Sequence, residues 1–167
     1  FHEAGHQEHA WFVRTRTGPR GVFEALWETK ELTVSFDGSC FIPKPFSKKD
    51  KCWTHSDQAP KTLGLACYQG FVALTSNRER TFVVYPRSHL VHHEYFVSKG
   101  AGDSSKNWQL IDPADLEGVG DRRKPLEVPA GALVLWDSRA FHQNQYGAPG
   151  SEERIVQYVS YQPKSDP

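Results

Sequence analysis

The chain has 167 residues, the usual size of one domain, and 38% of them are hydrophobic, which is enough for a buried core. Twenty basic residues balance twenty acidic ones, so no bulk field attracts nucleic acid or an anionic membrane. We therefore expect a small-molecule substrate as the partner, with no nucleic acid and no membrane; the oligomeric state does not follow from the sequence.

The cysteine spacing and the targeting segments of a sequence both bear on its cellular compartment. Cys40, Cys52 and Cys67 make an odd number without CxxC spacing, which indicates neither a disulfide framework nor a zinc ribbon. No apolar stretch approaches the roughly 18 residues of a membrane span, and no signal peptide is visible. We expect a cytoplasmic protein. The sequence contains no methionine, not even an initiator, so we expect either a domain truncated at its N-terminus or a processed product.

Residues 1–30 are predicted to be helical and to support the rest of the domain. A turn is expected at Gly18-Pro19, followed by an amphipathic helix. The apolar positions with helical spacing are Val22, Phe23, Leu26 and Trp27. We expect these residues to pack one face of the helix against the core.

Residues 31–167 contain short runs rich in β-branched and aromatic residues, separated by glycine and proline turns. The predicted strands are 32–36, 52–55, 62–75, 81–85, 132–136 and 154–161. This pattern favours a mainly β barrel or sandwich over a βαβ series, in a single domain spanning 1–167. The polar segment 99–123 is predicted to be an inserted surface loop with a short helix near 112–116, and loops of this length are often functional lids.

Three residues predict a metal site. His55 and Asp57 follow a strand-like run, and residues i and i+2 of an extended chain point to the same side, so both can reach one ion. His142, just after the most apolar late strand, is the candidate third ligand. Two imidazoles and one carboxylate form the facial triad that leaves coordination positions open on Fe(II).

Arg154 is a candidate for binding the carboxylate of a 2-oxo acid. It begins a predicted strand on which Arg154, Val156, Tyr158 and Ser160 share one face, so its side chain can point inward. The guanidinium group binds carboxylates bidentately, whereas a buried arginine without an anionic partner is costly. A carboxylate ligand would remove that cost.

The sequence resembles the phytanoyl-CoA dioxygenase-like branch of the Fe(II)/2-oxoglutarate oxygenases over most of its length. The segments that carry the resemblance are 53–58 (Trp-Thr-His-Ser-Asp-Gln), 82–89 (Phe-Val-Val-Tyr-Pro-Arg-Ser-His), 128–137, His142 and Arg154. The resemblance implies a double-stranded β-helix (a jelly-roll, cupin-like core, residues 31–167) with the N-terminal helices packed outside. It also implies that His55, Asp57 and His142 bind Fe(II) and are catalytic, and that Arg154, Asn144 and Gln69 contact 2-oxoglutarate.

The reaction implied by this resemblance is hydroxylation of a small-molecule or lipid-like substrate by a ferryl species. O₂ and 2-oxoglutarate are the co-substrates, and succinate and CO₂ are released. Asp57 favours hydroxylation, because related halogenases carry a small residue at this position. The sequence departs from the family at Arg87, where a glycine is usual, and at Val156, where a small polar residue is common. Tyr158 or Ser160 is therefore expected to supply a hydroxyl group to the co-substrate instead.

Other interpretations remain open. A cupin-like metalloenzyme that does not use 2-oxoglutarate and a non-catalytic β-helix binding domain both fit the predicted fold. His2-Glu-Ala-Gly-His6 spells HExxH, but Gly5 weakens a helix there and no third ligand has suitable spacing, so a protease is disfavoured. The histidines His89, His92 and His93 are interpreted as partly exposed, and the lysine-rich segment 44–51 as a solvated loop. Gln58 and Arg139 are polar residues close in sequence to the predicted ligands, which makes them candidates for contact with the substrate or with those ligands.

Overall fold

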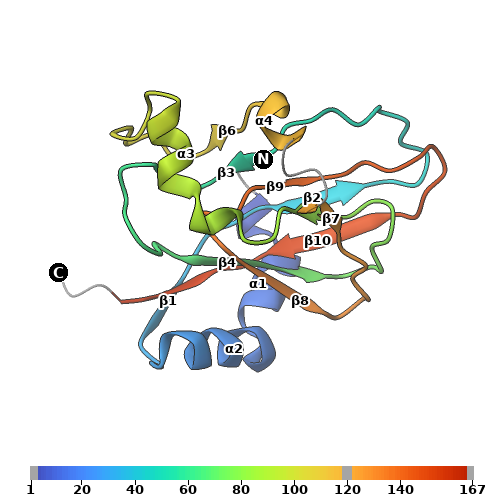
Figure 1. Ribbon diagram of the computed structural model, residues 1–167. Helices are drawn as coiled ribbons and strands as arrows, with labels where there is room; N and C mark the ends of the chain where they lie inside the picture. Colours follow the sequence, from blue (N-terminus) through green and yellow to red (C-terminus); the bar gives the residue numbers. More distant parts are fainter. Residues whose placement is uncertain (1–3, 118–121, 165–167) are drawn as a thin grey trace.

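The structure is a computed structural model that describes residues 4–117 and 122–164, and it consists mainly of antiparallel β-sheet (Figure 1). The helical segments within these ranges are η1 (Ala4–His6), α1 (Glu8–Arg14), α2 (Thr17–Trp27), η2 (Ser88–Leu90), α3 (His92–Ser98) and α4 (Pro113–Glu117). The mainly β class predicted from the short β-branched runs is confirmed. None of the helices in the described ranges has the length and apolar character needed to cross a membrane.

Two larger sheets and one strand pair make up the β-structure. The four-stranded sheet has the order β2 (Ser39–Ile42), β10 (Arg154–Tyr158), β4 (Tyr68–Ala73) and β8 (Leu133–Asp137). The five-stranded sheet has the order β6 (Gln109–Leu110), β3 (His55–Ser56), β9 (His142–Asn144), β5 (Phe82–Val84) and β7 (Lys124–Pro125). The remaining pair is β1 (Leu32–Val34) with β11 (Tyr161–Pro163). Every pairing is antiparallel.

The main core lies where the two sheets face each other. Phe71 and Trp136 come from the four-stranded sheet and Phe82 from the five-stranded one, and all three side chains are buried. The ring centroids of Phe71 and Phe82 are 5.8 Å apart, and those of Phe82 and Trp136 are 4.7 Å apart. Such close aromatic packing fixes the separation of the sheets and therefore the width of any site between them.

Replacing Phe71 with alanine is expected to lower the free energy of unfolding by about 3–5 kcal/mol, because it removes a fully buried ring and leaves a cavity. Urea unfolding monitored by circular dichroism measures this change. Phe71→Leu, which keeps most of the volume, should lose much less stability. Equal losses for the two variants would show that the ring does not act through packing.

The N-terminal helices pack on the outside of the four-stranded sheet, as predicted. Val13 of α1 and Phe23 of α2 form a buried cluster with Val159 and Tyr161, against which outward-facing residues of β4 and β8 pack. In Figure 1, α2 lies beneath this sheet, on the side away from β3 and β9. The predicted turn at Gly18-Pro19 is wrong, because both residues lie in the first turn of α2, where proline needs no N–H partner.

The prediction of one long strand over 62–75 is wrong for its first part, since β4 begins at Tyr68. The buried Gln58 side chain folds the preceding loop: its amide donates to the carbonyls of Thr62 and Gly64, at 2.7 and 2.8 Å, and accepts from Ala66 N–H at 3.0 Å. Gly64 has a φ of 73°, which breaks an extended run. Gln58 is therefore part of the loop structure.

The insertion predicted over 99–123 is more ordered than a surface loop. Within its described part, β6 pairs with β3 and so extends the five-stranded sheet, and α4 matches the expected short helix. Backbone bonds from Ile111 N–H to the Thr54 carbonyl and from Trp108 N–H to the Asp57 carbonyl fix it further. Residues 118–121 of the predicted insertion lie outside the described residues.

Candidate metal centre

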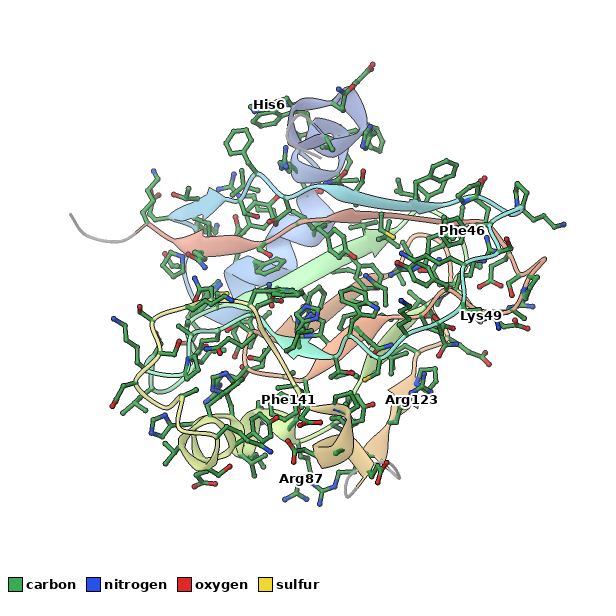
Figure 2. The ribbon with its side chains drawn as sticks, turned by 90° about the horizontal axis from the view of Figure 1, so that it is seen from above. His6, Phe46, Lys49, Arg87, Arg123 and Phe141 are labelled. Carbon is green, nitrogen blue, oxygen red and sulfur yellow. The ribbon has the colours of Figure 1, made fainter. Side chains whose placement is uncertain are left out.

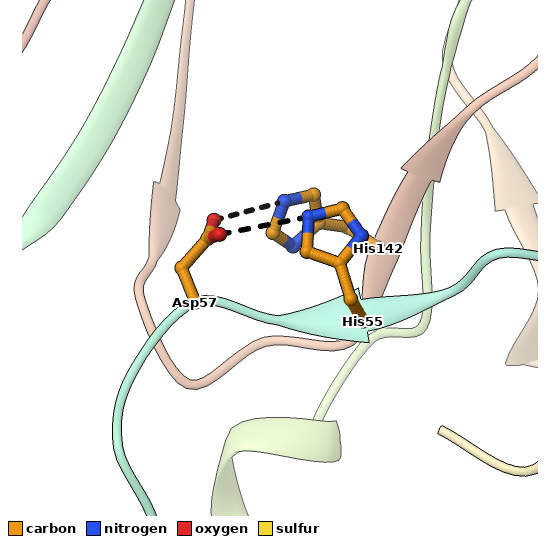
Figure 3. A group of neighbouring side chains, drawn as sticks. All are labelled: His55, Asp57 and His142. Carbon is orange, nitrogen blue, oxygen red and sulfur yellow. Dashed lines mark ion pairs between the residues drawn. The ribbon is translucent and has the colours of Figure 1, made fainter. Parts of the chain in front are cut away.

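The two histidines of the predicted triad meet across a strand pair. His55 on β3 and His142 on β9 are directly opposite each other, and their ring centroids are 4.3 Å apart. Asp57 follows β3 by one residue and turns its carboxylate toward both rings (Figure 3). Its two oxygens lie 3.6 Å from Nε2 of His55 and 3.3 Å from Nε2 of His142.

Backbone carbonyls fix the orientation of both imidazoles. Nδ1 of His55 lies 3.1 Å from the Trp53 carbonyl oxygen, and Nδ1 of His142 lies 2.9 Å from that of Ala140. A carbonyl only accepts, so each Nδ1 carries the proton and donates it, which leaves Nε2 with a free lone pair. Metal-binding histidines are typically held in this way by a second hydrogen bond.

The donor set is therefore complementary to a cation. Two Nε2 lone pairs and one carboxylate converge, and the three ligand atoms lie within 4.8 Å of one another. A deprotonated Nε2 atom and a carboxylate oxygen are both acceptors and repel each other. Without a cation between them, at least one Nε2 atom would therefore have to carry an additional proton to contact Asp57 favourably. The His55 and His142 side chains are almost completely buried, so water supplies little compensation. Among the residues that the structure describes, His55, Asp57 and His142 are the side chains whose ligand atoms lie close enough together to hold one metal ion.

The pKa values favour the ligand forms of the residues. Burial, together with the nearby charge of His142, lowers the pKa of His55 from its ordinary value of 6.5 to about 4. Burial raises the pKa of Asp57, but the hydrogen bond and charge of His142, the charge of His55 and a bond from Gln69 outweigh it, so that pKa is lowered. His55 is thus neutral and Asp57 ionised near neutral pH, as metal binding requires.

The lowered pKa of His55 predicts how the stability of the metal-free protein depends on pH. The unfolded chain binds a proton at His55 below pH 6.5, but the folded protein does so only near pH 4, so the free energy of unfolding should fall as the pH drops across this window. Burial also lowers the pKa of His92, which makes the free energy of unfolding fall in the same direction. The lowered pKa of Asp57 affects the free energy of unfolding only below pH 3.8, its ordinary pKa. Urea unfolding between pH 4.5 and 7 measures the slope. His55→Gln should make it shallower; an unchanged slope would contradict the assignment.

Aromatic rings surround His55. The indole of Trp53 stacks on it with centroids 5.1 Å apart and an interplanar angle of 18°, and Trp108 lies 5.2 Å away. Trp108 comes from the insertion, is 45% exposed and has a φ of 56°, an uncommon conformation for a residue other than glycine. No pattern in the sequence predicts Trp108 as a residue of the site, because its position depends on the pairing of β6 with β3.

A cavity of about 230 Å³ opens beside the three residues. Its walls come from both sheets and the adjoining loops and are formed by Asp37, Gly38, Trp53, His55, Asp57, Gln69, Gly70, Phe82, Trp136, His142, Asn144, Tyr158 and Ser160. Gln69 and Asn144, both predicted to contact a co-substrate, thus lie in the same cavity as the triad. Gln69 Oε1, Asn144 Oδ1 and Trp136 Nε1 are buried there without a hydrogen-bond partner. Unpaired buried polar atoms in a cavity wall are suited to a polar ligand.

Arg154 lies behind this wall, at the start of β10. Its side chain is fully buried, and its charge opposes the rise that burial causes in the pKa of Tyr158. Nε donates to Asn77 Oδ1 at 3.2 Å and Nη1 to Cys40 Sγ at 3.2 Å, whereas Nη2 has no partner. Arg154 forms no ion pair with any acidic side chain in the described ranges.

Two other buried arginines provide an internal comparison. Arg80 donates through both Nη atoms to the carbonyls of Pro43, Lys44 and Phe46, and Arg14 donates to those of Gly5 and Asp37. Both have structural partners for their terminal nitrogens. Arg154 has only one weak sulfur acceptor at this end of the side chain. The predicted inward orientation of Arg154 is confirmed, because its side chain is fully buried. Compared with Arg14 and Arg80, Arg154 keeps a terminal nitrogen, Nη2, that is available to a ligand.

The hydroxyl group expected near Arg154 is best placed on Tyr158. Tyr158 and Ser160 both line the cavity, but Tyr158 also accepts a hydrogen bond from Asn144 Nδ2 at 2.9 Å and lies within the influence of Arg154. Val156, which departs from the family pattern, is fully buried in the core. Its apolar side chain therefore serves packing.

Several other sequence candidates have structural roles. Arg139 is paired with Asp137 at 2.6 Å, and His92 is buried, with Nε2 3.1 Å from the Gln58 carbonyl, so its predicted partial exposure is wrong. Cys40, Cys52 and Cys67 are free thiols. Of the HExxH segment, His2 and Glu3 lie outside the described residues, and His6 is at the outer edge of the molecule, beside the N-terminal helix (Figure 2).

The lysine-rich loop at 44–51 was expected to be solvated. Its lysine side chains are exposed, and Phe46 and Lys49 lie at the right-hand side of the view, away from His6 at the top (Figure 2). Buried Arg80 fixes one end of the loop, and Asp50 accepts from the N–H of Tyr146 at 2.6 Å. The loop is thus solvated on its outside but anchored by specific bonds.

Comparison with known proteins gives one relative in sequence and several in fold. No model of a known protein family matches the chain. Ava biosynthesis cluster protein O of Aspergillus versicolor is 30% identical over 177 aligned residues, covering 98% of this chain and 57% of that protein. The chain therefore spans little more than half the length of this relative.

Similar solved structures include EvdMO1 (TM-score 0.59, 15% identity) and AviO1 from Streptomyces viridochromogenes Tue57 (TM-score 0.58, 16% identity). The first match covers 94% of this chain and 33% of that one, and the second covers 99% and 67%. At these identities the likeness shows a shared fold alone. HygX from Streptomyces hygroscopicus with iron bound is more distant, with a TM-score of 0.47 and 12% identity over 75% of this chain and 56% of that one.

Proposed function

We propose that this chain is an Fe(II)- and 2-oxoglutarate-dependent oxygenase that hydroxylates a small molecule. The observation that carries the proposal is a His-Asp-His donor set at a cavity whose wall residue Tyr158 adjoins the buried Arg154, whose Nη2 has no partner. The donor set suits the metal and the arginine suits a dicarboxylate. The two facing antiparallel sheets support the finer assignment of the fold as a double-stranded β-helix.

The donor set suits a non-haem iron ion. His55 and His142 would bind through Nε2 and Asp57 through its carboxylate, a facial arrangement that leaves open positions for exchangeable ligands. Zinc in structural sites prefers a closed tetrahedron with cysteine, and the thiols of the chain are not part of this group. Bound iron would supply O₂ activation, which couples oxidation of 2-oxoglutarate to succinate and CO₂ with insertion of oxygen into a substrate C–H bond.

The remaining residues would bind, orient and exclude water. Arg154 would bind the distal carboxylate through Nη2, and the Tyr158 hydroxyl would donate to the same group. Asn144 and Gln69 would contact the co-substrate in the cavity. Trp53 and Trp108 flank the His55 ring and would keep bulk water from that side of the metal.

The substrate class is proposed from the cavity and from the relative. The cavity is small and mixes aromatic walls with unpaired polar atoms, which suits a small molecule better than a polymer. The name of the Aspergillus relative assigns that protein to a biosynthesis cluster, which is consistent with a small-molecule substrate for this chain. We propose that no nucleic acid or membrane partner is needed.

The proposal is tested by measuring succinate formation from 2-oxoglutarate without added substrate, in the presence of Fe(II) and O₂. Slow, iron-dependent and O₂-dependent succinate formation is expected, and Asp57→Ala should abolish it while leaving the protein folded. A cupin-like enzyme of another kind would bind metal but form no succinate. A non-catalytic binding domain would do neither, so the assay together with metal analysis separates the three classes.

A further inference from the structure

The surroundings of Arg154 are neutral. Its guanidinium group contacts Asn77, Cys40 and the ring of Phe71, whose centroid is 5.5 Å from the central carbon. Tyr158 is the remaining polar neighbour, and burial raises its pKa, so it is uncharged at neutral pH. The buried arginines Arg14 and Arg80 donate to backbone carbonyls, whereas Arg154 has neither a carbonyl nor a carboxylate partner within residues 4–117 and 122–164.

Asn77 is held more firmly than its loop position suggests. Its N–H and carbonyl both pair with Val128, at 2.8 Å each, and its side chain is fully buried. Nδ2 donates to the carbonyl of Thr75 at 2.9 Å. A carbonyl only accepts and a guanidinium only donates, so just one orientation of the amide satisfies both neighbours. That orientation points Oδ1 at Nε of Arg154.

We propose that Asn77 is the positioning residue of the anion site, an inference that rests on the proposed function. Its amide oxygen fixes Nε of Arg154 without cancelling the positive charge, which leaves Nη2 for the distal carboxylate of the co-substrate. Aspartate at this position would have nearly the same shape. It would instead form a buried ion pair with Arg154 and compete with the ligand for the guanidinium group.

The test compares Asn77→Asp with Asn77→Ala by two measurements that rank the variants in opposite orders. The affinity for 2-oxoglutarate, from anaerobic titration of the Fe(II) protein, should be highest for the wild type and lowest for Asn77→Asp. We expect the aspartate to weaken binding by about tenfold to a hundredfold, the range for loss of a hydrogen bond to a charged group. Asn77→Ala should lie between, because it loosens Arg154 but leaves its charge available.

The second measurement is the thermal unfolding temperature of the ligand-free protein. Here Asn77→Asp should exceed Asn77→Ala, because the ion pair with the buried guanidinium group outweighs the repulsion between the new carboxylate oxygen and the Thr75 carbonyl, to which Nδ2 donates at 2.9 Å. A merely structural role for Asn77 would give the same ranking in both measurements and would overturn the proposal. Asn107→Asp, the same change at an exposed residue, is the matched control and should leave the affinity unchanged.

Failure of the proposed function gives a different result. If the wild type binds no 2-oxoglutarate, that function is wrong, and so is the ligand assigned to this anion site. The unfolding temperatures still test the contact between Asn77 and Arg154, because an aspartate beside the guanidinium group must make that variant more stable than the alanine variant. The reverse order would refute the positioning role regardless of the ligand.

Discussion

His142→Ala is expected to abolish succinate formation and to weaken Fe(II) binding by at least about a hundredfold, since even the outer partners of metal ligands contribute up to that factor. His142 supplies an Nε2 atom 3.3 Å from Asp57, and its ring is oriented by the Ala140 carbonyl. Alanine keeps the strand β9 but removes this ligand. Equilibrium dialysis against Fe(II) without oxygen and an assay of succinate measure the two effects.

The matched control is His9→Ala, which removes an exposed imidazole on α1, outside the cavity. It should bind Fe(II) and form succinate like the wild type. Circular dichroism establishes that both variants are folded. Wild-type turnover by His142→Ala would mean that the metal is held elsewhere.

Arg154→Met is expected to weaken 2-oxoglutarate binding by about a hundredfold, because it removes the charge-assisted hydrogen bond from Nη2, and such bonds contribute up to about 3 kcal/mol. Fe(II) binding should be retained, since Arg154 is not part of the His-Asp-His group. Stability should fall only slightly, because the change takes the Arg154 donor from the buried Asn77 Oδ1 but also removes a buried charge. Methionine fills similar space, and the guanidinium group that it replaces is buried without an acidic partner.

Arg80→Met provides the contrasting control. Arg80 is equally buried but donates to three backbone carbonyls of the loop after β2, so its loss should lower the free energy of unfolding measured in urea. The 2-oxoglutarate affinity of the folded variant should be unaffected. If Arg154→Met proves as destabilising as Arg80→Met and still binds 2-oxoglutarate, Arg154 is a structural residue.

Local patterns predicted much of the site. The alternation of side chains in an extended chain placed His55 and Asp57 on one side, and it predicted the inward orientation of Arg154. These inferences use only neighbours in sequence. They succeeded because His55 and Arg154 lie in the strands β3 and β10, and Asp57 follows β3 directly.

Long-range pairing could not be predicted in the same way. His142 lies on β9, whose His-Gln-Asn sequence has no apolar alternation, and its position opposite His55 is a matter of register between distant strands. The two-residue strand β6, which brings Trp108 beside His55, likewise has no periodic signal.

Polar side chains that act within loops were equally hard to assign. Gln58 looked like a candidate for contact with the metal ligands because it is next to Asp57, but it is occupied by three bonds to the loop 62–66. Asn77 lies more than seventy residues before Arg154 and was not a candidate at all. Only the folded arrangement shows which amide belongs to the site.

Anaerobic titration followed by visible absorption tests whether the chain binds Fe(II) and 2-oxoglutarate together at one site. A weak metal-to-ligand charge-transfer band should grow with 2-oxoglutarate when Fe(II) is present, saturate at one equivalent per chain and be absent without the metal. Folded, Fe(II)-loaded protein that shows no such band at saturating 2-oxoglutarate would contradict the account.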